Sequence, residues 1–208
     1  MNNAIQDRML PSIIDHIKQI EHGFKHIIAA GDQILADQEE HHFDLALKLL
    51  ADNSYQVRML ATYILGELSP THPDALLTLK TRVADDQNWR VQEMLAKAFD
   101  QYCKVAGYEK SIPIIKKWLS DPNPNVKRAV TEGLRIWTGR PYFKDHPHIA
   151  ITLIGTNKSD DSEYLRKSVG NALHDISKKH SQAVLDEISK WDLKEKKTAF
   201  TYQLAMGK

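Results

Sequence analysis

Apolar residues recur along this chain in four segments that each open on an aspartate. The segments are DNSYQVRMLATYILGEL from Asp52, DQNWRVQEMLAKAFDQY from Asp86, DPNPNVKRAVTEGLRIW from Asp121 and DDSEYLRKSVGNALHDIS from Asp160. Each has an apolar residue five positions after its aspartate, and these residues, Val57, Val91, Val126 and Leu165, stand 34, 35 and 39 positions apart. That period is typical of stacked helical pairs, and Asp, Asn and Ser before an apolar run are typical N-cap residues.

The stretches between these segments predict the partner helices, over residues 41–51, 73–84, 110–119 and 147–156. A single helical pair leaves an apolar face uncovered, which a stacked neighbour buries. We therefore expect one domain over residues 1–208, an all-α, right-handed solenoid (α-α superhelix) of HEAT-like helical repeats. Residues 1–40 should form N-terminal capping helices, residues 41–180 four repeats, and residues 181–208 a C-terminal cap.

Composition narrows the class of protein. With 208 residues, of which 42% are hydrophobic, the chain is long enough to bury a core. The start, MNNAIQDRML, lacks the charged and apolar regions of a signal peptide, and no stretch has the length of a membrane span, so we expect a cytoplasmic protein. Its single cysteine, Cys103, suits a reducing compartment. A formal net charge of +1 means that any contact with nucleic acid depends on local clustering of cations.

A helical wheel of the second segment separates two faces. Val91, Met94, Leu95 and Ala98 form the core stripe, whereas Trp89, Glu93 and Lys97 lie at about 160°, 200° and 240° from Val91. The same arithmetic places further residues on the matching face of the other segments: Met59 and Tyr63; Arg128, Glu132 and Arg135; Lys167, Asn171 and His174. In HEAT-like arrays these helices line the concave binding surface.

Basic residues gather in the same helices and their continuations. They are Arg58, Lys127, Arg128, Arg135, Arg140, Arg166, Lys167, Lys178 and Lys179. Such a set can follow a phosphate backbone, although charge runs are more often plain solvated faces.

Three stretches resemble the HEAT-like-repeat DNA glycosylases of alkylation repair, the AlkD and AlkC group. They are the Trp-x-x-x-carboxylate helix from Trp89 to Glu93, IKKWLSDPNPNVKRAV at residues 114–130, and YLRKSVGNALHDISKKH at residues 164–180. The resemblance covers about residues 40–195 and implies hydrolysis of the N-glycosidic bond of N3- and N7-alkylpurines in double-stranded DNA. It also implies that the base is not drawn into a pocket, unlike in most base-excision enzymes.

The resemblance implies roles for individual residues. Glu93 stands where the AlkD branch has its catalytic Asp, Trp89 matches one aromatic wall of the site, and Arg128 matches a basic residue that contacts the DNA backbone. Asn171 stands where a second aromatic wall is expected. Because Asn has no π face and Glu is one methylene longer than Asp, we expect a divergent AlkD-type paralogue with weak DNA binding and reduced or lost excision.

Three functions remain open at this point. The favoured one is a DNA-binding member of the family, in which Glu93 and Trp89 form the catalytic pair. Arg128, Lys127, Arg135, Arg166, Lys167, Lys97 and Arg58 would then bind DNA. The second is an active alkylpurine glycosylase in which another aromatic residue, such as Tyr63, covers the sugar, and the third is a protein-interaction scaffold.

Simpler interpretations of the same residues also exist. Glu93 and Lys97 have the spacing of a surface ion pair, and Trp89 could instead pack on a neighbouring helix. Trp118, Trp137 and Trp191 are typical core or seam residues. His22 and His26 have i, i+4 spacing but no obvious third ligand, so we expect no metal, no cofactor and no nucleotide. We expect a monomer.

Overall fold

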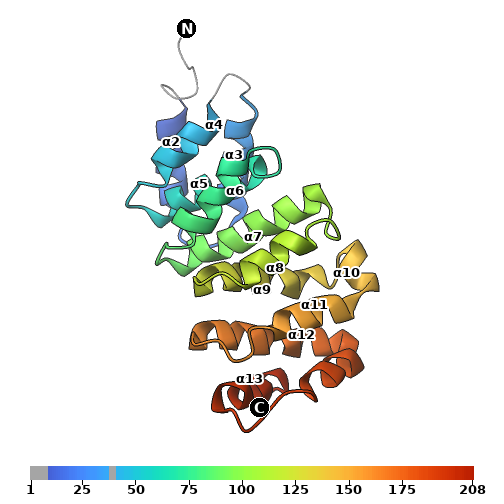
Figure 1. Cartoon of the computed structure of the whole chain (residues 1–208). Helices are drawn as coiled ribbons and strands as arrows, with labels where there is room; N and C mark the ends of the chain where they lie inside the picture. Colours follow the sequence, from blue (N-terminus) through green and yellow to red (C-terminus); the bar gives the residue numbers. More distant parts are fainter. Residues whose placement is uncertain (1–8, 38–40) are drawn as a thin grey trace. The chain divides into compact units, whose positions relative to one another are not determined.

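The computed structural model describes residues 9–37 and 41–208, and these residues are helical with no strand among them (Figure 1). The chain divides into two compact units, up to residue 105 and from residue 106 onward. In the first unit the helices are α2 (Leu10–Lys18), α3 (Lys25–Leu35), α4 (His42–Leu49), α5 (Tyr55–Leu68), α6 (Pro73–Thr78), the π-helical turn η1 (Leu79–Val83) and α7 (Trp89–Ala106). In the second unit they are α8 (Ile112–Leu119), α9 (Pro124–Trp137), α10 (Pro141–Asp145), α11 (Pro147–Gly155), α12 (Glu163–Ile188) and α13 (Lys196–Ala205).

Three of the four predicted helical pairs pack as expected. Helix α4 packs on α5, α8 packs on α9, and α11 packs on α12, and in each pair the second helix is one of the Asp-led segments. Three features go beyond the sequence pattern. The helix expected over residues 73–84 ends in the π-helical turn η1, a short helix α10 begins at Pro141, and α12 continues past a kink at His180.

The four aspartates form one repeated turn, which we call the Asp turn. In each case the carboxylate accepts the backbone N–H of the residue two positions later: Ser54 at 2.7 Å, Asn88 at 2.8 Å, Asn123 at 2.9 Å and Ser162 at 2.9 Å. Side chains six positions after the aspartate donate back to carbonyl oxygens of this turn, as Arg58, Gln92 and Arg166 do. The Asp turn therefore fixes how the chain enters each second helix.

The core contains the predicted apolar stripe. Val57, Val91, Val126 and Leu165 are fully buried, and Trp118, Trp137 and Trp191 are also buried, as expected. Met59 was predicted to face outward, and this prediction is wrong because only 2% of the residue is exposed. The reason is that α2, α3 and α4 all pack against α5, so this helix has no open face at Met59.

Candidate nucleic-acid interface

The Trp-x-x-x-carboxylate pair opens helix α7. Trp89 is the first residue of this helix, and the side chain of Asn88 accepts the backbone N–H of Arg90 at 2.9 Å, which holds the helix start in place. Trp89 is 53% exposed, and Glu93, one turn further on, is half-buried. This value confirms the predicted exposure of the indole. Such exposure is unusual, because a tryptophan ring is normally mostly buried.

A cation that the sequence analysis did not single out covers one face of Trp89. The guanidinium of Arg90 lies 4.5 Å from the centre of the Trp89 ring and 5.1 Å from that of Tyr55. Stacking of this kind stabilises an exposed aromatic residue by cation-π attraction and fixes the plane of the ring. The adjacency of Arg90 to an outward tryptophan was the available signal for this contact. Trp89 is thus an ordered surface feature with Arg90 against it.

Lys97 continues the same face of α7. Its side chain is exposed, and Nζ lies 5.1 Å from the centre of the Phe24 ring in the loop before α3. A lysine in this position carries its charge at the surface while its stem covers apolar atoms. Trp89, Glu93 and Lys97 therefore follow one another along one face, as the wheel predicted.

Tyr63 is held by contacts within the first unit. Its hydroxyl donates to the Asp32 carboxylate at 2.5 Å, and its ring lies where a side chain at Gly31 would be, so only glycine fits there. Burial, together with this hydrogen bond, raises the pKa of the Tyr63 hydroxyl. Tyr63 also lines a cavity of about 210 Å³ with Glu67 and Lys97. Burial raises the pKa of the Glu67 carboxyl, against the effect of a hydrogen bond from Gln101.

Three of the cations expected to bind DNA hold the Asp turns. Nε and Nη2 of Arg58 donate to the Asp86 carboxylate at 2.5 and 3.2 Å, and its Nη1 donates to two backbone carbonyls of the preceding turn. Lys127 donates to Asp160 at 2.6 Å. Arg166 is 9% exposed, donates to the carbonyls of its own turn and stacks over Phe200 at 5.5 Å. Arg58 and Lys127 thus link successive repeats, and all three side chains carry little charge to the surface.

Arg128 and Arg135 belong to an ion-pair network in the second unit. Arg128 is 6% exposed and lies 3.7 Å from the Glu132 carboxylate, which also lies 3.4 Å from Arg135. Nε of Arg135 donates to Asp175 at 2.6 Å, and Lys178 lies 2.7 Å from the other oxygen of that carboxylate. The hydrogen bond from Lys178, aided by Arg135, lowers the pKa of the Asp175 carboxyl. The expected basic end of this face is therefore a mixture of cations and carboxylates.

Lys167 and Asn171 lie further along α12 and are exposed. Lys167 pairs with Glu163 at 2.7 Å across one helical turn, and both side chains are more than half exposed, so the pair contributes little stability. Asn171 presents an amide at the position where the resemblance expects an aromatic ring.

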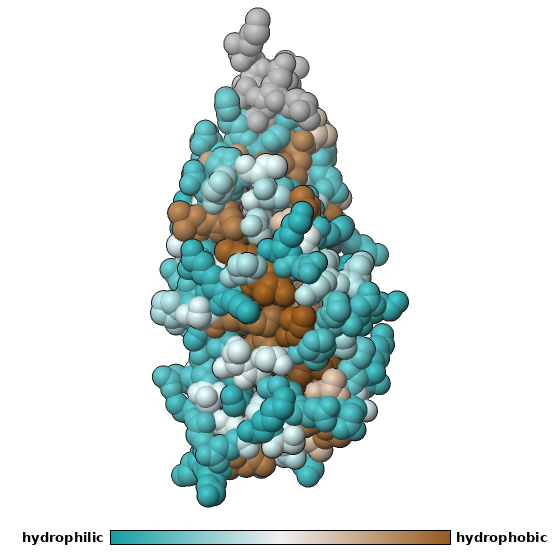
Figure 2. Space-filling model, turned by 45° about the vertical axis from the view of Figure 1, so that its right-hand side comes forward, coloured by the Kyte–Doolittle hydropathy of each residue, from teal (hydrophilic) through white to brown (hydrophobic). Residues whose placement is uncertain are grey.

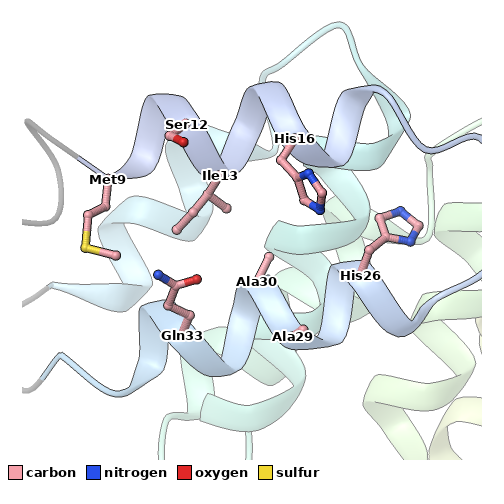
Figure 3. Close-up of a pocket in the computed structure, with 8 residues that line it drawn as sticks. All are labelled: Met9, Ser12, Ile13, His16, His26, Ala29, Ala30 and Gln33. Carbon is pink, nitrogen blue, oxygen red and sulfur yellow. The ribbon is translucent and has the colours of Figure 1, made fainter.

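A separate cavity of about 440 Å³ lies between α2 and α3. Figure 3 shows the imidazoles of His16 and His26 facing the same end of this cavity, with Met9 and Gln33 at the other end. Burial and the nearby His16 lower the pKa of His26. The sequence spacing paired His26 with His22, but His22 lies instead beside the Glu21 carboxylate, at 3.8 Å. Within residues 9–37 and 41–208, no group of three or more His, Cys, Asp or Glu side chains is placed to hold a metal ion.

The comparisons with known proteins concern the family and the fold of this chain. Residues 25–205 match the sequence model of a family described as DNA alkylation repair enzyme. The chain belongs to this family. Among solved structures, AlkD2 from Streptococcus mutans superposes with a TM-score of 0.89 at 45% identity, over 94% of each chain. The protein smu.31 from Streptococcus mutans UA159 superposes with a TM-score of 0.85 at 43% identity, over 94% of this chain and 96% of that one.

Two further proteins are less similar to this chain, in sequence identity or in the share of the chain that is matched. Pseudomonas fluorescens alkylpurine DNA glycosylase AlkC, solved with DNA containing an abasic site analog, superposes with a TM-score of 0.67 at 21% identity. The match covers 88% of this chain and 51% of AlkC, and it shows the fold alone. The uncharacterized protein YhaZ of Bacillus subtilis is 33% identical over 87 residues, which are 40% of this chain and 24% of YhaZ. The expected all-α fold and the resemblance to the alkylation repair family are both confirmed.

On the face seen in Figure 2, hydrophilic residues cover most of the area and hydrophobic residues gather in patches between them. None of the described helices combines the length and the apolar character needed to cross a membrane.

Proposed function

We propose that this member of the DNA alkylation repair family binds double-stranded DNA, alkylated DNA included, and that its excision activity is reduced or lost. The observation that carries the proposal is the pair on α7, an exposed Trp89 at the helix start with Glu93 one turn later. The proposal is also supported by membership of a family described as DNA alkylation repair enzyme, and by AlkC having been solved with DNA containing an abasic site analog.

The chemistry that this pair would perform is electrostatic. Alkylation at N3 or N7 gives the purine a positive charge and makes it a good leaving group, so no general acid is required. A carboxylate such as Glu93 beside the anomeric carbon stabilises the oxocarbenium-like sugar, and the π face of Trp89 attracts the same positive charge. Neither residue needs a cofactor for this role.

Two features support reduced excision. Asn171 offers no π face at the position of the second expected wall, and the carboxylate of Glu93 stands one methylene further from the backbone than an aspartate. A displacement of about 1 Å in a reacting group costs about a hundredfold in rate. Weak DNA binding is supported by Arg58, Lys127 and Arg166, whose charges are directed to carboxylates and turn carbonyls.

The decisive experiment is release of N7-methylguanine and N3-methyladenine from methylated duplex DNA at excess protein. Wild type, Glu93→Gln and the matched surface control Glu109→Gln are measured together, because Glu109 is exposed and lies outside the proposed site. We expect release no more than slightly above the spontaneous rate, and the same in all three proteins. Rapid release that Glu93→Gln abolishes and Glu109→Gln retains would replace the proposal with an active glycosylase.

DNA binding is tested separately by its dependence on salt. Each phosphate contact contributes a slope of about −0.9 in log affinity against log salt concentration. Lys167→Gln should reduce the slope by about one, whereas Arg166→Gln should leave it unchanged. No binding of the wild type at low salt would remove the DNA-binding proposal and leave a protein-interaction scaffold.

A further inference from the structure

A second exposed aromatic residue occurs in the second unit. Tyr164 is the second residue of α12, and it is 48% exposed although its ring is large and apolar. The helix start beneath it is ordered, because the Ser162 side chain accepts the backbone N–H of Leu165 at 3.3 Å. The ring therefore stands at a fixed point of the fold and not on a mobile loop.

The ring of Tyr164 rests on a buried cation. The guanidinium of Arg128 lies 4.5 Å from the ring centre, and Arg128 itself is only 6% exposed. The Glu132 carboxylate, 3.7 Å away, offsets the charge of Arg128. A planar guanidinium held in this way orders the ring before any ligand arrives, which lowers the entropic cost of binding. One face of the ring is covered by Arg128, and the exposed area lies on the rest of the ring.

Tyr164 shares its side of α12 with two other exposed residues. Lys167 and Asn171 follow it by three and seven positions, a spacing that places all three on one side of a helix. Seven residues correspond to about 10 Å along the helix axis. Tyr164 thus supplies a π face about two turns before Asn171, the position at which the expected aromatic is missing.

The first unit contains the same combination of groups. Trp89, 53% exposed, has Arg90 at 4.5 Å from its ring, as Tyr164 has Arg128 at the same distance. Both rings are near the start of an Asp-led helix. Aromatic faces of this kind accept stacked nucleotides whatever the base, because every base has a π face.

We infer that Tyr164 is a stacking residue for DNA, and that its exposed face packs against an unstacked base or deoxyribose beside an abasic site in the duplex. This inference rests on the proposed function, since it requires DNA as the ligand. A missing base exposes the faces of its neighbours and of the sugar, so a ring on the protein has most to cover there. Lys167, on the same side of α12, is placed to meet the adjacent backbone.

The experiment measures affinity by fluorescence anisotropy, at low salt, for two labelled duplexes of the same sequence. One duplex contains a tetrahydrofuran abasic analogue and the other is intact. The proteins are wild type, Tyr164→Leu, Tyr164→Phe and the control Leu185→Ala, which removes an exposed apolar side chain from the later part of α12. We expect Tyr164→Leu to weaken binding to the abasic duplex about tenfold, and Tyr164→Phe and Leu185→Ala to change it less than twofold.

The outcomes separate this inference from the proposed function. If the wild type binds neither duplex, the proposed function fails. If it binds the abasic duplex and Tyr164→Leu binds within twofold of it, or if Tyr164→Phe loses as much as Tyr164→Leu, the stacking role is overturned. Should Tyr164→Leu not fold, 2-aminopurine beside the abasic analogue provides the readout in a Trp89→Leu background. Quenching on binding supports the inference, and unchanged emission overturns it.

Discussion

Removing the guanidinium of Arg58 tests whether cations stabilise the Asp turns. Arg58 makes two hydrogen bonds to the Asp86 carboxylate and two to backbone carbonyls, and the side chains of Arg58 and Asp86 are 20% and 10% exposed. The substitution Arg58→Met keeps much of the aliphatic volume but leaves these acceptors without their donor. The affected carboxylate also accepts the backbone N–H of Asn88 in the next Asp turn.

The expected loss follows from these contacts. Breaking a fully buried ion pair by removing one partner costs about 3–5 kcal/mol, and a hydrogen bond to a charged group contributes about 1.5–3 kcal/mol. Because Arg58 is partly solvated, water replaces some of the lost donors. We therefore expect the free energy of unfolding to fall by about 2–3 kcal/mol for Arg58→Met.

Urea unfolding followed by circular dichroism at 222 nm measures this loss, with Lys167→Met as the matched control. Lys167 pairs with Glu163 at the surface, where both side chains are more than half exposed, and its loss should cost less than about 0.5 kcal/mol. Equal and small losses in the two variants would refute the structural role of Arg58. The same proteins, at concentrations where both are folded, should bind DNA with the wild-type salt slope for Arg58→Met and a shallower slope for Lys167→Met.

Three further outcomes concern the first unit. The pKa of His26 is lowered, so the unfolded chain binds more protons than the folded chain below about pH 6.5, and stability falls as the pH drops through that range. In thermal melts, His26→Phe should reduce this loss of Tm, and removing the charge at His16 should reduce it as well. The pKa of Glu67 is raised, so its ionised form costs stability once the pH exceeds the unfolded value, and Glu67→Gln should raise Tm at pH 7 and not at pH 4; an unchanged Tm at pH 7 contradicts this. A Cβ at Gly66 would lie 2.7 Å from Cβ of Ala98, so Gly66→Ala should lower the free energy of unfolding by about 1–3 kcal/mol, as measured in urea. An unchanged free energy of unfolding would contradict this close packing.

The repeat pattern predicted most of the fold because helical pairs are determined by local signals. The Asp turns, the apolar positions five residues later and the partner helices all follow from spacing that is visible in the chain. The kink at His180 and the π-helical turn at Leu79–Val83 carry no such signal, because they depend on how neighbouring helices pack. Met59 shows the same limit, since its burial is due to helices that a wheel of α5 does not include.

The candidate site was predicted unevenly for a related reason. Trp89 and Lys97 are exposed as the wheel indicated, because one helix determines their direction. Arg128 has the same direction by arithmetic but is buried under Tyr164, a residue of a different repeat. Arg90 was missed because its contact with Trp89 depends on how its side chain folds back along the surface. The contacts of long cationic side chains therefore depend on rotamers and, for Arg128, on a neighbour that is distant in sequence.

The Asp turn also bears on what the net charge of this chain says about its surface. At the position six residues after the aspartate, Arg58, Gln92, Lys127 and Arg166 occupy equivalent places, and neutral Gln92 donates to its turn carbonyl at 2.8 Å as the arginines do. A repeat therefore accepts either a cation or an amide at this position. Exchanging a cation for an amide there changes the net charge of the chain but keeps the hydrogen bond to the turn, so the net charge is a poor measure of the cations that this fold offers to a ligand.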